Sequence, residues 1–106
     1  MSEQAFLTRC EQLLDRIEDA LEAAGVDAEL MRNGHVLDIE FDDGSHIVVN
    51  GQAPLQEIWL AARDGAHHYR EHDGRWLDTR SGEDLEVVLS KSVGRQAGLP
   101  VVLKFT

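Results

Sequence analysis

The sequence predicts an α+β domain, a two-layer α/β sandwich in which two helices pack on one face of a five- to six-stranded antiparallel sheet. Three observations support this prediction. Segments with helical spacing of apolar residues lie near the two ends of the chain, short alternating segments lie between them, and Asn-Gly or Asp-Gly pairs separate several of these segments. Neither helix alternates with single strands, so a parallel arrangement is not expected, and the second sheet face should be open to solvent.

The first element is a helix expected over residues 3–24. Its apolar residues recur at intervals of three and four, and they are Phe6, Cys10, Leu13, Leu14, Ile17 and Leu21. Gly25 is well placed to end the helix, because glycine readily adopts the left-handed conformation found at helix C-termini. Since Cys10 lies on the apolar stripe, it is expected to be a buried core thiol and not a nucleophile.

Six short segments between the helices are expected to form the strands. They cover residues 26–31, 35–41, 45–50, 55–62, 66–72 and 75–79. The pairs Asn33-Gly34, Asp43-Gly44 and Asp73-Gly74 favour tight hairpin turns. In the second segment, hydrophobic and acidic residues alternate, which is typical of a strand with one buried face.

The second helix is expected to begin at a capping box formed by Ser81 and Asp84 and to run to about Ala97. Its inward face is expected to consist of Leu85, Val88, Leu89 and Ser92. Gly98 and the proline that follows it soon afterwards stop the helix, and the rest of the chain reads as a short extended tail.

The composition is that of one folded domain over residues 1–106, with 42% hydrophobic and 28% charged residues. The single cysteine cannot form an internal disulfide, which favours a reducing compartment. The first residues lack the basic and apolar regions of a secretory signal, and no apolar run approaches the ~18 residues of a membrane span. We therefore expect a cytoplasmic protein.

The net charge of −10 is unevenly distributed along the chain. Residues 1–43 contain 12 acidic residues and three arginines, a balance of −9, whereas residues 44–106 contain eight acidic and seven basic residues, a balance of −1. Such a field repels nucleic acid and anionic membrane, so neither is an expected partner. It attracts cations or a basic protein surface.

The densest acidic stretch is residues 11–29, which include only one arginine. Its seven acids are Glu11, Asp15, Glu18, Asp19, Glu22, Asp27 and Glu29. On an isolated helix, positions 11, 15, 18 and 22 fall within an arc of about 60°. Like charges at these spacings imply on the order of 1–2 kcal/mol of self-repulsion in total. The pattern is consistent with an ordinary soluble surface or with a surface that holds something positive, because clustered carboxylates suit hard cations and iron.

Other chemistries find less support in the sequence. A zinc site at His68 and His72 is not expected, because four residues along a strand separate them by about 13 Å. No Ser-His-Asp arrangement, glycine-rich phosphate loop or HExxH pattern is present, so the chain is not expected to be an enzyme.

Trp59 is the other candidate functional residue. Alternation in the fourth strand places Ile58, Leu60 and Ala62 on one face, which resembles core, and Trp59 on the opposite, open face. An exposed tryptophan among polar neighbours is common where proteins dock. Trp76, by contrast, is expected to fill the core under the second helix.

The whole chain resembles the frataxin family, in particular its bacterial CyaY type. The segment "NGQAPLQEIWLAA" is similar to the family signature Asn-x-Gln-x-Pro-(x)4-Trp-Leu. The "DGRW" hairpin, the "SGEDL" entry to the second helix and the acidic "IEDALE" in the first helix add to the resemblance.

The resemblance implies a frataxin-like sandwich and an accessory, regulatory role in iron–sulfur cluster assembly. Frataxins bind iron weakly on a surface acidic ridge and dock on the cysteine desulfurase and its scaffold protein, where they modulate the rate of cluster synthesis. By position, six acids would form the ridge, namely Glu11, Glu18, Asp19, Glu22, Asp27 and Glu29. Asp15 adds charge outside the usual family pattern and is a further candidate metal-binding residue. Asn50, Gln52, Pro54 and Trp59 would belong to the partner-binding surface. The implied protein is a monomer that could form oligomers when it binds iron (Fe2+ or Fe3+), without an organic cofactor.

Some positions depart from the family pattern, and alternative functions follow from the same charges. Ala23 and Ala24 stand where the family often keeps further acids, whereas Asp38 and Glu40 add charge outside the usual pattern. The cation sites are therefore expected to be shifted or fewer. The alternative hypothesis is an acidic modulator that docks on the desulfurase without metal, and a ferrous-iron oxidase ranks last.

Overall fold

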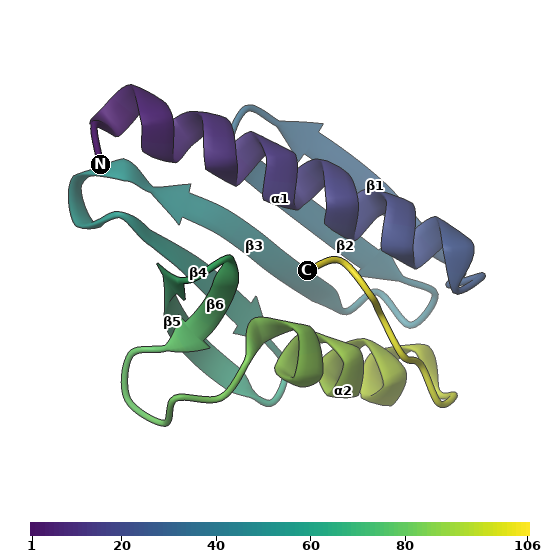
Figure 1. The fold of residues 1–106 in the computed structure, drawn as a ribbon. Helices are drawn as coiled ribbons and strands as arrows, with labels where there is room; N and C mark the ends of the chain where they lie inside the picture. The colour runs from purple at the N-terminus through teal and green to yellow at the C-terminus, as the bar shows by residue number, and fades with distance from the viewer.

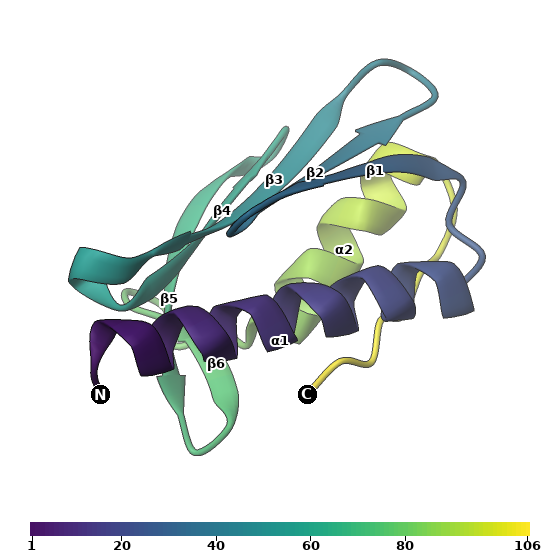
Figure 2. The ribbon, with the colours of Figure 1, turned by 90° about the horizontal axis from the view of Figure 1, so that it is seen from above.

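In the computed structural model, which describes residues 1–106, two helices cover one face of a six-stranded antiparallel sheet (Figures 1 and 2). The helices are α1 (Glu3–Ala23) and α2 (Leu85–Ala97). The strands are β1 (Ala28–Asn33), β2 (Val36–Phe41), β3 (His46–Gln52), β4 (Glu57–Ala62), β5 (Gly65–His72) and β6 (Arg75–Asp78). Each strand pairs with the next one along the chain, in the order β1-β2-β3-β4-β5-β6. The predicted fold class is confirmed, with six strands.

The first helix forms as predicted, apart from its last residue. Ser2 caps the N-terminus, and its hydroxyl accepts a hydrogen bond from the Ala5 N–H at 3.1 Å. The helix ends at Ala23, and Gly25 follows with a φ of 68°. All six residues of the predicted apolar stripe are buried, together with Ala20.

The hairpin turns lie where the sequence predicts them, with one shift. In the first hairpin Asn33 pairs with Val36, so the turn residues are Gly34 and His35, one position later than the expected pair. Gly34 takes the first turn position with a φ of 59°, which glycine adopts without a steric penalty. Asp73 also has a positive φ, as the turn before β6 requires.

Several element boundaries differ from the sequence prediction, since β1 covers residues 28–33 and not 26–31, and β3 covers residues 46–52 and not 45–50. β4 begins at Glu57 and not at residue 55, because Ala53–Leu55 forms a 3-10 turn, η1, that contains Pro54. The second helix is capped by Asp84 and not by Ser81, whose hydroxyl instead accepts a hydrogen bond from the Glu83 N–H. A bridge between Leu77 and Asp84 keeps the chain extended up to the cap.

The core lies between the sheet and the two helices. Trp76 is buried as predicted, but its ring packs edge-on against Phe6 of α1, with ring centroids 6.2 Å apart, and so also supports the first helix. On α2, Val88 is only half-buried, whereas Val93 and Gln96 join the predicted inward residues.

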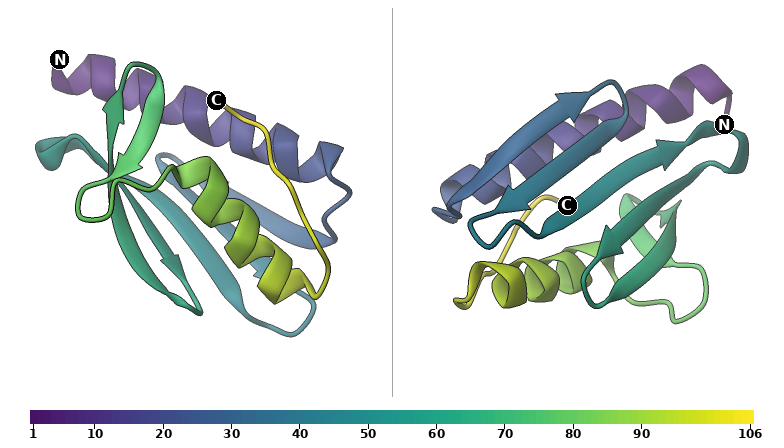
Figure 3. Two further views of the ribbon diagram at one scale, coloured as in Figure 1. Left: turned by 60° about the horizontal axis from the view of Figure 1, so that its bottom comes forward. Right: turned by 180° about the vertical axis from the view of Figure 1, so that it is seen from behind.

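The C-terminal tail runs from the end of α2 back across the helical layer towards α1 (Figure 3). Leu103 and Phe105 bury their side chains in the core. The Glu86 carboxylate accepts hydrogen bonds from the N–H groups of Phe105 and Thr106, at 2.7 and 2.9 Å, and holds the tail in place. Neither helix has the length and hydropathy that crossing a membrane requires.

Candidate functional site

The acidic residues singled out in the sequence lie along one edge of the molecule. Five of them are on α1, Asp27 is in the connection that follows it, and Glu29 is in β1. β1 is the edge strand that lies beside α1 (Figure 1), so the backbone brings these residues to the same edge. Strand alternation points Glu29 away from α1, to the open face of the sheet, because Arg32 of the same strand faces α1.

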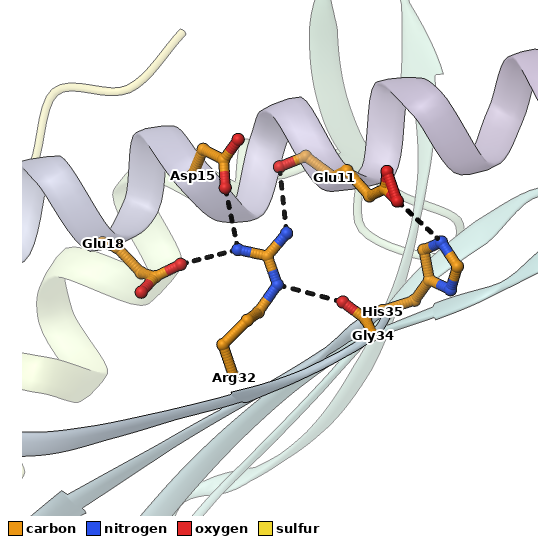
Figure 4. Close-up of polar contacts among 6 residues, drawn as sticks. All are labelled: Glu11, Asp15, Glu18, Arg32, Gly34 and His35. Carbon is orange, nitrogen blue, oxygen red and sulfur yellow. Dashed lines mark hydrogen bonds and ion pairs between the residues drawn. The ribbon is translucent and has the colours of Figure 1, made fainter.

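Arg32 of β1 reaches across to α1 and contacts part of the acidic stretch (Figure 4). Its Nη1 atom lies 2.9 Å from an Asp15 oxygen and 2.6 Å from a Glu18 oxygen. Its other nitrogens donate to the backbone carbonyls of Glu11, at 3.3 Å, and Gly34, at 3.0 Å. Burial lowers the pKa of the guanidinium and the two carboxylates raise it, with a net upward shift. Arg32 therefore offsets much of the repulsion that an isolated helix would have.

Glu11 belongs to the same group of residues. One of its carboxylate oxygens lies 3.6 Å from Nε2 of His35, the second residue of the first hairpin turn (Figure 4). The N-terminal part of the acidic stretch is therefore already in contact with positive or titratable groups of the same chain.

The four other acids, Asp19, Glu22, Asp27 and Glu29, form no ion pair. We call them the unpaired acids. The structure gathers no three His, Cys, Asp or Glu side chains into a group that could hold a metal ion. A cation on this surface would therefore have one or two carboxylate ligands and keep much of its hydration shell.

Trp59 lies on the open face of the sheet, as predicted. Ile58 and Leu60 on either side of it are buried against the helices, and the half-buried indole points the other way. Antiparallel pairing aligns Trp59 with Asn50 of β3 and with His68 of β5. The side-chain oxygen Oδ1 of Asn50 accepts a hydrogen bond from the side-chain amide Nε2–H of Gln52 at 2.9 Å. Three of the four predicted partner-binding residues thus share this face.

Pro54, the fourth of these residues, lies elsewhere. It is exposed in η1 and lines a pocket with Met1, Phe6 and Trp76 at the end of the molecule where α1 begins.

The sequence prediction did not include Glu57, His68 and Arg70 among the candidate partner-binding residues, although all three lie near Trp59. The His68 imidazole stacks on the indole, with ring centroids 4.3 Å apart and planes 7° from parallel. Glu57 accepts a hydrogen bond from the indole Nε1–H at 3.0 Å. Strand alternation placed Glu57 on the face of Trp59, but only the pairing register shows that His68 stands opposite Trp59.

Cys10 is a core thiol, as predicted. It is fully buried, and burial raises its pKa to about 11. Gly51 of β3 packs directly on it, because a Cβ atom at this position would lie 2.5 Å from the sulfur. The thiol is therefore protonated at neutral pH and enclosed by the fold.

Comparison with known proteins gives a consistent result. Residues 1–99 match the family model described as a frataxin-like domain. A protein of Ralstonia nicotianae is 49% identical, over 97% of this chain and 95% of its own, and one of Cupriavidus metallidurans is 44% identical, over 98% and 97%. Both are named iron-sulfur cluster assembly protein CyaY.

Solved structures also resemble the fold. Frataxin from Psychromonas ingrahamii superposes with a TM-score of 0.91 at 34% identity, over 100% of this chain and 99% of its own. Trimeric yeast frataxin, whose structure is described as complexed with ferrous, has a TM-score of 0.68 at 25% identity, over 92% and 88%.

Proposed function

This chain belongs to the frataxin family, and from that premise we propose that it is an accessory, regulatory protein of iron–sulfur cluster assembly. The observation that carries the proposal is the identity of nearly half of all aligned residues, over almost the full length, with relatives named for that process. In this role the chain binds iron weakly and docks on the cysteine desulfurase–scaffold complex.

The unpaired acids are the proposed place of iron binding. Their carboxylates form no ion pair, and oxygen ligands suit ferrous and ferric iron. Glu11, Asp15 and Glu18 contribute less, because Arg32 and His35 already contact them. Iron here is a cargo bound by few ligands, so we expect the affinity to be low.

Titration with ferrous iron under anaerobic conditions tests this part of the proposal. Amide NMR signals of residues 19–29 should broaden first, and those of residues 11–18 less. Replacing Asp19 and Glu22 with their amides should reduce the broadening. The control removes the same charge at Asp73 and Glu83, which form no ion pair, and should leave it intact. Uniform or absent broadening in the wild-type chain would contradict iron binding at this edge.

The second candidate function needs no metal. The unpaired acids would dock on a basic patch of the desulfurase, and the contact of Arg32 with Asp15 and Glu18 shows that this edge accommodates guanidinium groups. Binding of the purified desulfurase–scaffold complex, measured with and without iron and over a range of salt concentrations, separates the two functions. A complex that forms without iron and dissociates as salt rises would support docking alone.

A further inference from the structure

Glu57 is an acidic residue that is buried on the open face of the sheet. Its side chain is only 9% exposed, although the face around it is open to solvent. Acidic side chains are rarely buried unless they are paired. Here Trp59, His68 and Arg70 provide the partners, and no helix covers them.

The two carboxylate oxygens of Glu57 contact three different side chains. Oε1 accepts the Trp59 indole N–H at 3.0 Å and lies 3.6 Å from Nδ1 of His68. Oε2 lies 3.1 Å from Nη2 of Arg70. The stacked imidazole of His68 holds the indole from the side of β5. The Glu57 carboxylate thus holds the Trp59 indole, the stacked His68 imidazole and the Arg70 guanidinium in one arrangement.

We propose that Glu57 is the positioning residue of the partner-docking surface, and that it presents Trp59 to the desulfurase–scaffold complex in a preset orientation. This inference rests on the proposed docking function. A flexible side chain that must be ordered on binding weakens affinity by about two- to tenfold, and Glu57 orders Trp59, His68 and Arg70 before the partner arrives.

The test replaces Glu57 with glutamine, which has nearly the same shape but no charge. If the glutamine oxygen still accepts the indole hydrogen bond, the amide NH2 takes the place of Oε2 and opposes the donor of Arg70. We expect the affinity for the purified desulfurase–scaffold complex to fall about tenfold. Glu40→Gln is the matched control, because Glu40 lies on the same sheet face in β2 and contacts His46 instead. The control should bind like the wild-type chain.

A double-mutant cycle separates positioning from general damage to the surface. If Glu57 acts by positioning the Trp59 side chain, its replacement should have little further effect in a Trp59→Ala background. The inference would be overturned if Glu57→Gln reduced the affinity for the complex as strongly in that background as in the wild-type chain. It would also be overturned if Glu57→Gln alone left the affinity unchanged.

A measurement on the free chain does not depend on the partner. Nuclear Overhauser contacts between the rings of Trp59 and His68 should be present in the wild-type chain and in Glu40→Gln, and weak or absent in Glu57→Gln. Intact ring contacts in Glu57→Gln would refute the positioning role. If the wild-type chain binds no desulfurase–scaffold complex, the proposed docking function fails, and the ring contacts alone decide whether Glu57 positions Trp59.

Discussion

Replacing Arg32 with glutamine should destabilise the fold, and the loss should depend on salt. The substitution removes two ion pairs, to Asp15 and Glu18, together with donors to two backbone carbonyls. An exposed ion pair contributes about 0.2–1 kcal/mol, and each like-charge contact on a helix costs about 0.2–0.5 kcal/mol when it is no longer compensated. We therefore expect the free energy of unfolding to fall by about 1–2 kcal/mol at low salt.

The assay is urea unfolding at low salt and at about 1 M NaCl, where the screening length falls to roughly 3 Å. The difference between wild type and Arg32→Gln should shrink at high salt. Arg16→Gln is the matched control. Like Arg32→Gln it removes one positive charge, but Arg16 lies on α1 and forms no ion pair. An equal loss in both variants, or a loss at Arg32 that salt does not change, would refute the assignment of Arg32 as the compensating base.

Three further predictions concern the rest of the molecule. Burial raises the pKa of Glu86, but hydrogen bonds from the N–H groups of residues 105–106 lower it more, so the net shift of this pKa is downward. The stabilisation from this carboxylate should therefore be complete above the usual glutamate pKa of about 4.3 and be lost as the pH falls below it. Melting curves across this range should show the loss in the wild-type chain and a flatter profile in Glu86→Gln. Gly51→Ala should cost about 1–3 kcal/mol by overpacking, and a second substitution, Cys10→Ala, should restore part of the loss in the same unfolding assay. Trp59→Ala should weaken binding of the desulfurase–scaffold complex while the melting temperature changes little, and a large drop in that temperature would show that the indole supports the core instead.

Local patterns predicted the architecture because they record which side of each element is buried. The period of the apolar residues gave the position and inward face of α1, and glycine pairs marked the hairpins. The errors occurred where two local signals compete. Ser81 and Asp84 are both good capping residues, and the bridge from Leu77 to Asp84 decides in favour of the second. Pro54 lies within the 3-10 turn η1, which moves the start of β4 to Glu57.

The sequence alone determined the fold class, the acidic character of the first two-fifths of the chain and the face on which Trp59 stands. Each of these follows from composition, from the spacing of residues within an element or from the order of the elements along the chain. Only the tertiary structure decided which acids are paired and what surrounds Trp59, because Arg32 comes from a strand 14 to 17 residues away from its carboxylate partners. Likewise, His68 meets Trp59 only through the register of β4 and β5. Contacts between elements depend on register and packing, which no single segment of the chain encodes.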